Sequence, residues 1–202
     1  MSVLLVLAQT LTNLVIVPAG PGLPPGWQLN RLQGVDPPTF EVTRSHTLQV
    51  VAIGQGGTAT YRLRPPIRPP SSLRPGMLTW HWRTGTPLRA ADLKRRAGDD
   101  SPIRVVITFQ DGRTITYAWG NRESRGESFA SWAGHNRMVV VLQLAEDADG
   151  SWHVERRDPF SDYRRLWNRA PKSIVAVGVS CDSEGTKTRA AAEIGDLTWE
   201  GP

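Results

Sequence analysis

The chain has 202 residues, of which 39% are hydrophobic and 21% are charged. This composition supplies enough apolar side chains for one folded core, and it excludes a disordered chain or a coiled coil. A single cysteine, 19 glycines and 16 prolines exclude a disulfide framework and favour many turns over long helices. The formal net charge of +5 comes from an excess of arginine.

The chain begins with a segment, residues 1–22, that we separate from a single domain expected over residues 23–202. Residues 3–8 are apolar but lack the basic residues that begin a secretory signal. They are either the remnant of such a signal or part of a first strand, and residues 14–17 also suit a strand. No apolar run reaches the roughly 18 residues of a membrane-spanning helix. We expect a periplasmic or secreted protein, with a cytoplasmic location as the alternative.

The first half of the domain alternates short strand patterns with turns. Strands are predicted over residues 39–43, 47–53 and 58–63, with a glycine-rich turn before the last of them. Five prolines between residues 65 and 75 then predict an extended connector that cannot form a central strand.

The second half has a more regular strand pattern. In residues 77–83 the side chains of Leu78, Trp80 and Trp82 share one face, as in a strand that is buried on one side. Asp111 and Gly112 supply a hairpin turn. The other predicted strands are residues 103–109, 113–119, 137–144, 152–156, 173–180 and 194–200. About ten short strands with regular turns are typical of an all-β sandwich or jelly roll.

One or two short helices accompany these strands. Asp158 followed by Pro159 is a helix start, because aspartate caps the first N–H groups and proline suits the first helical position. The helix is expected over residues 160–167, and a second over residues 90–96.

Eight tryptophans are a large number for this length. Buried indoles fill β cores, and exposed ones form platforms on which sugars stack. The strand patterns place Trp80, Trp82, Trp152 and Trp199 in the core. Trp119 and Trp132 flank a polar loop, residues 120–134, and we expect them to be exposed there.

The acidic residues gather at turns, where their chemistry allows two functions besides capping and salt bridges. Loop oxygens are the ligands that calcium prefers, so we expect no cofactor other than a structural calcium ion. Paired carboxylates also hydrolyse glycosidic bonds. The histidines have no metal-ligand spacing, and no nucleophile or phosphate-loop motif is present. The acids concerned are Asp99, Asp100, Asp158, Asp162, Asp182, Glu184 and Asp196.

A basic strip between residues 62 and 96 offers a third kind of chemistry, because clustered cations attract phosphate, sulfate or uronate groups. No nucleic-acid motif accompanies it, so nucleic acid is not the expected partner. The strip consists of Arg62, Arg64, Arg68, Arg74, Arg83, Arg89, Lys94, Arg95 and Arg96.

Several blocks, taken in order, resemble one family. They are LPPGW (23–27), LTWHWR (78–83), GDD (98–100) followed by residues 104–109, YAWGNR (117–122), W152 with ERRD (155–158), DYRR (162–165) and AEIGDLTW (192–199). Together they are similar to the uncharacterised bacterial family called domain of unknown function 3047. The resemblance covers about residues 23–200. This chain departs from the family pattern in the loop at residues 180–186 and at Ile194.

The resemblance implies an exported protein, because members of the family commonly look exported, and it implies no established activity. The first and last blocks also resemble galactose-binding-like jelly rolls, a fold that carries carbohydrate-binding modules. The expected fold is therefore a jelly-roll-like β-sandwich.

The leading hypothesis is a non-catalytic module that binds a glycan or a similar polar ligand. Arginine would pair with acidic sugar groups, carboxylates would accept hydroxyl groups, and Trp119 would stack. The first alternative is a polysaccharide-active enzyme with two loop carboxylates about 5 to 9.5 Å apart. The second is an anion or nucleic-acid binder that needs the arginines of the strip on one face. The candidate ligand-binding residues are Asp99, Asp100, Arg104, Trp119, Arg122, Asp182 and Asp196.

Overall fold

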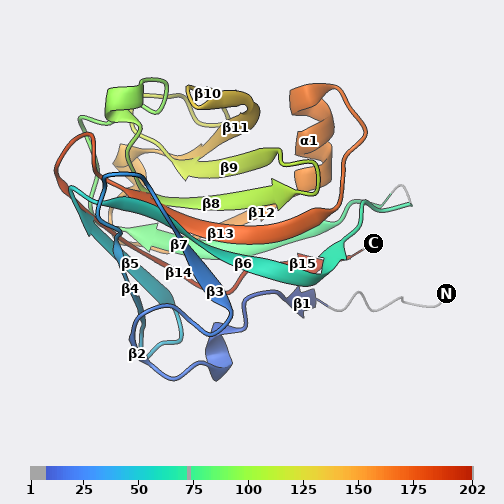
Figure 1. Ribbon diagram of the computed structural model, residues 1–202, viewed down its shortest axis with the longest axis horizontal. Helices are drawn as coiled ribbons and strands as arrows, with labels where there is room; N and C mark the ends of the chain where they lie inside the picture. The colour runs from blue at the N-terminus through green and yellow to red at the C-terminus, as the bar shows by residue number, and fades with distance from the viewer. Residues whose placement is uncertain (1–7, 72–73, 202) are drawn as a thin grey trace.

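The computed structural model describes residues 8–71 and 74–201, and in it two β-sheets pack face to face (Figure 1). The sandwich predicted from the strand pattern is therefore confirmed. Sheet A contains β1 (Ala8–Thr10), β2 (Gly20–Pro21), β4 (Thr39–Val42), β5 (Leu48–Ile53), β7 (Met77–Thr84), β12 (His153–Arg157), β14 (Arg189–Ile194) and β15 (Thr198–Glu200). Sheet B contains β3 (Trp27–Arg31), β6 (Gly56–Ile67), β8 (Ser101–Phe109), β9 (Thr114–Trp119), β10 (Ser128–Ser131), β11 (Gly134–Gln143) and β13 (Ile174–Asp182).

The strand order mixes segments that are far apart in the sequence. Sheet B runs β10-β11-β9-β8-β13-β6-β3, and its β9–β11 pair is parallel. Sheet A runs β1-β15-β7-β14-β5-β4-β2. Strands β14 and β15 pair with successive parts of one edge of β7, and β12 pairs with its other edge.

Aromatic side chains fill the space between the sheets. Leu78, Trp80 and Trp82 alternate along β7 and are buried, as predicted. The Trp80 ring lies 5.4 Å from that of Tyr117 in sheet B, and the Trp82 ring lies 5.7 Å from that of Trp119. Burying a side chain of this size stabilises the fold by about 1.5 to 3 kcal/mol.

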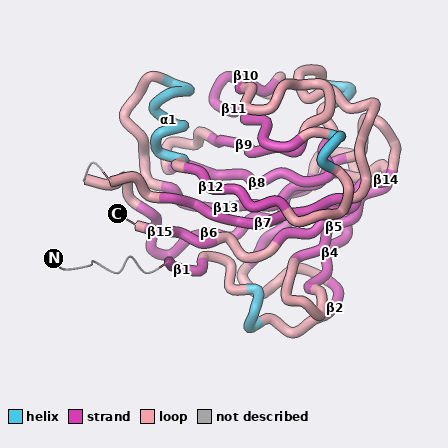
Figure 2. The backbone as a smooth tube through the Cα atoms, turned by 180° about the vertical axis from the view of Figure 1, so that it is seen from behind, coloured by secondary structure: helices cyan, strands magenta, loops and turns pink. Residues whose placement is uncertain are grey.

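Helix α1 (Pro159–Trp167) covers one end of sheet B (Figure 2). A carboxylate oxygen of Asp158 accepts hydrogen bonds from the N–H groups of Phe160 and Ser161, both at 3.0 Å. The predicted cap is therefore confirmed. The rings of Phe160 and Tyr163 pack against Phe109 of β8.

Two local predictions were wrong. Residues 90–95 form turns before a short 3-10 helix, η2 (Arg96–Gly98). Residues 14–16 form a second 3-10 helix, η1 (Leu14–Ile16), of which only Leu14 is buried. Strand β6 continues into the predicted proline connector through Pro65 and Pro66, where its neighbour β3 has already ended, so these prolines do not lie in a central strand.

Strands β3, β10 and β14 were not predicted from their sequences. Half of strand β14 is alanine, a residue with low strand propensity. Of the apolar stretch at residues 3–8, all but Ala8 lies outside the described residues.

Candidate functional site

Four of the seven predicted site residues meet around Arg104, and we call Asp99, Asp100, Arg104 and Asp182 the Arg104 cluster. Arg104 alternates with buried residues of β8, so its side chain lies on the outer face of sheet B. Its guanidinium donates to the carboxylate of Asp99 at 2.8 Å and to the Asp99 carbonyl at 2.7 Å. Only 12% of the Arg104 side chain is exposed. Most of its donors are therefore turned toward the protein.

Asp100 fastens a second loop to this cluster. Its two carboxylate oxygens accept the N–H groups of Gly185 and Thr186, at 3.1 and 2.5 Å. The Asp100 side chain is buried. A buried carboxylate whose oxygens are both occupied by main-chain donors holds a loop in place and has little capacity left for a ligand.

Asp182 ends β13 in the same region and is also buried. Burial raises the pKa of its carboxyl to about 6, against the opposing effect of the Arg104 charge and the hydrogen bond from the Glu184 N–H. The like charges of Asp100 and Asp99 raise it further. Asp182 therefore changes its charge in the weakly acidic range.

The other three predicted residues lie elsewhere, and the stacking role predicted for Trp119 was wrong. Only 1% of Trp119 is exposed, and its indole N–H donates to the carbonyl of Leu144 at 2.8 Å. Arg122 is exposed and makes no ion pair within the described part of the chain. Asp196 accepts the Thr12 hydroxyl and the Leu14 N–H, both at 2.7 Å. It therefore fastens the N-terminal segment to sheet A.

Trp132 lies at the rim of the Arg104 cluster, and its predicted exposure is confirmed. The side chain is 48% exposed, its indole N–H donates to Asp99, and the Arg96 guanidinium lies 5.3 Å from its ring centre. Ligand binding by the Arg104 cluster and this ring stays a prediction.

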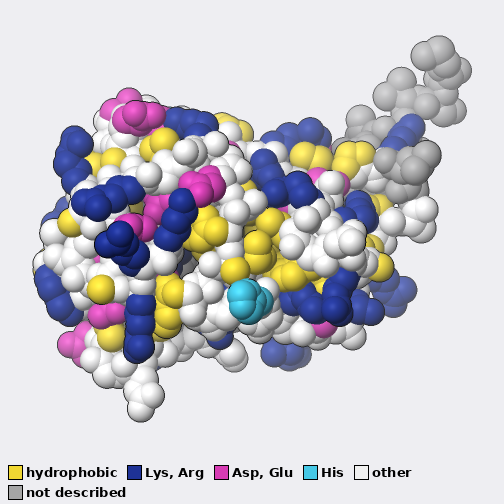
Figure 3. Space-filling model, turned by 90° about the horizontal axis from the view of Figure 1, so that it is seen from above, with side chains coloured by type: hydrophobic (Ala, Val, Ile, Leu, Met, Phe, Trp, Pro, Cys, Tyr) yellow, Lys and Arg dark blue, Asp and Glu magenta, His cyan; other side chains and the backbone are white. Residues whose placement is uncertain are grey.

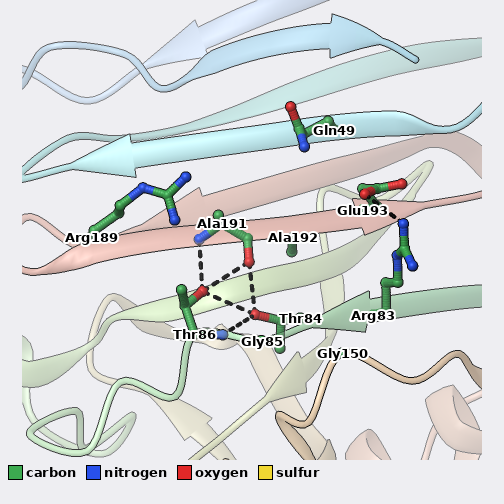
Figure 4. A pocket seen from close by; sticks show the side chains of 10 residues that line it. All are labelled: Gln49, Arg83, Thr84, Gly85, Thr86, Gly150, Arg189, Ala191, Ala192 and Glu193. Carbon is green, nitrogen blue, oxygen red and sulfur yellow. Dashed lines mark hydrogen bonds and ion pairs between the residues drawn. The ribbon is translucent and has the colours of Figure 1, made fainter. Parts of the chain in front are cut away.

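A pocket on the outer face of sheet A has the geometry of a binding site that the sequence did not predict. Its volume is about 350 Å³, within the range of small-molecule sites. Figure 4 shows the residues around it. We call it the sheet A pocket, and it is lined by Gln49, Arg83, Thr84, Gly85, Thr86, Gly150, Arg189, Ala191, Ala192 and Glu193.

Hydrogen bonds make the floor of this pocket rigid. The ladder between β7 and β14 ends at Thr84, and the Thr86 hydroxyl then accepts the Ala191 N–H at 2.9 Å (Figure 4). The hydroxyls of Thr84 and Thr86 also lie within hydrogen-bond distance of the Ala191 carbonyl, at 2.7 and 2.9 Å. Beyond the end of the main-chain ladder, side-chain hydroxyls therefore make the hydrogen bonds that join the two segments.

An ion pair crosses the same face. Arg83 donates to Glu193 at 2.8 Å, and the Thr47 hydroxyl donates to the other Glu193 oxygen at 3.0 Å. Within the described residues, the side chains of Gln49 and Arg189 make no hydrogen bond or ion pair. The pocket therefore combines a fixed ion pair with two polar side chains that are available to a ligand.

Trp152 lies beside the pocket as a partly exposed indole that contacts the lining residue Arg83, and its predicted place in the core was wrong. It is 39% exposed. The Arg83 guanidinium lies 4.6 Å from its ring centre, and the His81 ring packs edge-on at 4.7 Å. Trp152 stands one residue before β12 and is in phase with Val154, which points away from the core and is 71% exposed. The available signal in the sequence was the face of β7 opposite Trp80 and Trp82, which carries His81 and Arg83.

The hypothesis of an anion or nucleic-acid binder required the basic strip to form one surface. The structure does not place these residues on one surface. Arg62 lies on β6 of sheet B, whereas Arg83 lies on the outer face of sheet A, the opposite side of the sandwich. Lys94 and Arg95 belong to the connector after β7, and each has an acidic partner. Figure 3 shows Lys and Arg side chains in several separate patches on the side of the molecule it presents. The basic residues are separated because successive strands of this part of the chain, β6 and β7, belong to different sheets.

Within residues 8–71 and 74–201, no group of three or more His, Cys, Asp and Glu side chains is placed to hold a metal ion. None of the helices in these residues is long and apolar enough to cross a membrane.

Fold and site together define a two-sheet β-sandwich with an open polar pocket and an exposed indole on one outer face. The chain belongs to the family described as "Protein of unknown function (DUF3047)", whose model matches residues 25–198. The resemblance inferred from the ordered sequence blocks is therefore confirmed. No curated protein matched the chain.

Among solved structures, the chain is similar to the xyloglucanase domain of NopAA, a type three effector from Sinorhizobium fredii, in complex with cellobiose. The TM-score is 0.53 at 10% identity, over 98% of this chain and 99% of that one. An agarase matches with a TM-score of 0.45 at 10% identity, over 96% of this chain and 24% of that one. A xylanase mutant matches with a TM-score of 0.37 at 10% identity, over 96% and 84%. At this identity, the first likeness shows a shared β-sandwich fold.

Proposed function

We propose that this protein is a non-catalytic module that binds a glycan, or a polar ligand of similar chemistry, in the sheet A pocket. The observation that carries the proposal is Trp152, an exposed indole that Arg83 and His81 hold beside a polar pocket. A sugar ring has an apolar face that stacks on an aromatic ring, and it has hydroxyl groups around its edge that need hydrogen-bond partners.

The pocket supplies both hydrogen-bond donors and hydrogen-bond acceptors. Arg83 and Arg189 are donors with planar, forked geometry, Glu193 is an acceptor, and the Gln49 amide is both. Arg83 and Glu193 are already oriented by their ion pair, so ordering them costs little on binding.

The same residues favour binding over hydrolysis. The usual glycosidase mechanism requires two carboxyl groups across the sugar bond. One carboxylate, Glu193, lines the described pocket, and its oxygens are engaged by Arg83 and Thr47. In the Arg104 cluster, Asp99 and Asp100 are likewise committed to protein donors. These commitments leave no free carboxylate pair in either place.

The module is proposed to act in the periplasm or after secretion, where polysaccharides are encountered. The fold it shares with the xyloglucanase domain, which was solved with cellobiose, supports a sugar as the ligand. Its one cysteine, Cys181, is buried, so it would be protected from oxidation in such a compartment. No cofactor is part of the proposal, and binding should be unchanged by EDTA.

The test is a glycan array followed by isothermal titration calorimetry on the best glycan. Trp152→Ala is expected to weaken binding by about tenfold or more, because it removes the stacking platform. Trp132→Ala is the matched control, since it removes another exposed indole, at the rim of the Arg104 cluster.

The two variants separate the possible outcomes. Loss of binding in the Trp152 variant alone supports the sheet A pocket. Loss in the Trp132 variant alone would overturn this pocket and place the ligand at the Arg104 cluster. An array without any bound glycan would overturn the function itself.

A further inference from the structure

A second cavity opens at the seam between the two sheets, away from the sheet A pocket. Its volume is about 450 Å³, and it lies where β1 and β15, at one edge of sheet A, approach the end of β6 in sheet B (Figures 1 and 2). We call it the seam cavity. Its size falls within the range of sites for small molecules.

The charge in this cavity is entirely positive. Arg64 and Arg68 line it, and no aspartate or glutamate does so. Within the described residues neither arginine makes an ion pair, whereas Arg83, Lys94 and Arg95 of the same basic strip each have an acidic partner. Two guanidinium groups that line one cavity without an acidic neighbour give it a positive potential that attracts an anion.

Neutral polar groups and aromatic rings complete the lining. Gln9, Thr10 and Asn13 contribute amide and hydroxyl groups from the segment that includes β1. Tyr61 and Trp199 contribute ring surface from the two sheets. Such walls exclude part of the water around a bound anion, which strengthens its attraction to the arginines.

The backbone between the two arginines is fixed before any ligand binds. Pro65 and Pro66 have restricted φ angles, and Ile67 pairs with Ile174 of β13. A stiff segment loses little conformational freedom on binding, so more of the electrostatic attraction contributes to affinity.

We propose that the seam cavity binds an anionic group, a carboxylate, sulfate or phosphate, carried by a molecule about the size of one sugar. Arg64 and Arg68 pair with the anion, and the amides and hydroxyls of the β1 segment bind the rest of the molecule. This site does not depend on the sheet A pocket, so it can exist whether or not that pocket binds a glycan.

The experiment titrates the full chain with glucuronate, glucose 6-sulfate, glucose 6-phosphate, inorganic phosphate and, as the neutral probe, glucose. At least one anionic probe is expected to bind, and its affinity should fall as salt is added. Tighter binding of one sugar acid than of inorganic phosphate supports the proposal and identifies the anion, and equal binding of inorganic phosphate would overturn the role given to the β1 segment. The proposal is overturned if no anion binds, or if glucose binds as tightly as the acids.

A charge-matched pair of variants locates the site. The double variant Arg64→Gln, Arg68→Gln is expected to weaken anion binding by about tenfold or more, because charge-assisted hydrogen bonds are lost. The double variant Arg62→Gln, Arg89→Gln removes the same charge from exposed positions outside the cavity and should leave binding unchanged. Equal loss in both variants would show a diffuse charge effect and overturn the site. Trp152→Ala should leave anion binding intact, which separates this test from that of the glycan pocket.

Discussion

At the scale of single residues, Trp119 and Trp152 show how one step of register decides whether an indole is core or surface. Trp119 is the last residue of β9 and follows Ile115 and Tyr117 on the inward face. Trp152 stands just before β12, where His153 takes the inward position and packs its ring against Trp119. Both segments were predicted to be strands, and the errors concerned the face of each indole. Trp119 continues the inward alternation of β9, whereas Trp152 is in phase with Val154, which is 71% exposed.

Asp182 gives a prediction at this scale, because burial raises its pKa to about 6 in the folded protein. The ordinary value is near 4, so the folded state binds the proton more tightly than the unfolded state. Stability is therefore lost as pH rises from about 4 to 6 and stays lower above that. Asp182→Asn removes this cost. The variant should be more stable than the parent at pH 7.5 by on the order of 2 kcal/mol, with a much smaller difference at pH 4.

Urea unfolding of both proteins at the two pH values measures this difference. The Asn side chain keeps an oxygen that can accept the Glu184 N–H, so the comparison isolates the charge. A stability difference of the same size at both pH values would contradict the pKa shift.

At the scale of elements, the loop before β8 and the loop after β13 stabilise each other. Asp100 of the first loop accepts two N–H groups of the second, and Gly185 lies close to the Ala97 carbonyl. A Cβ atom at Gly185 would lie 2.3 Å from that oxygen. Because the obstacle is backbone, neither loop can yield by a simple rotation of a side chain.

Gly185→Ala is therefore expected to destabilise the fold by about 1 to 3 kcal/mol, the usual cost of overpacking. Gly85→Ala is the control, since a Cβ atom there meets nothing within 4 Å. Thermal and urea unfolding of the two variants measure the difference. Equal stability of the two would mean that the loops separate without cost.

At the scale of the whole molecule, the sheets are joined by polar contacts as well as by the aromatic core. One Glu155 oxygen, on β12 of sheet A, accepts the Gln143 amide of sheet B at 2.7 Å. The same oxygen accepts the Trp82 indole N–H at 3.2 Å. Glu155 thus satisfies two donors at the contact between the sheets.

Glu155→Ala leaves both donors without this partner and should lower stability by about 1 to 3 kcal/mol. Glu155→Gln keeps an acceptor and should recover much of the loss. Arg156→Ala, the neighbouring control, breaks an exposed ion pair with Glu200 and should cost less than about 1 kcal/mol. Urea unfolding followed by tryptophan fluorescence checks all three, and an equal loss for Glu155→Ala and Arg156→Ala would contradict a role between the sheets.

The sequence by itself determined the class of fold, most strands, the capped helix and the family, because these depend on local alternation, turn chemistry and ordered blocks. It also identified the residues of the Arg104 cluster. The tertiary structure decided which polar groups face each other. Asp99 and Asp100 accept hydrogen bonds from protein donors, and Trp119 is buried. Arg83 of β7 forms an ion pair with Glu193 of β14. Pairing between strands that lie over a hundred residues apart has no local signal, so the sheet A pocket and the seam cavity became visible only in three dimensions.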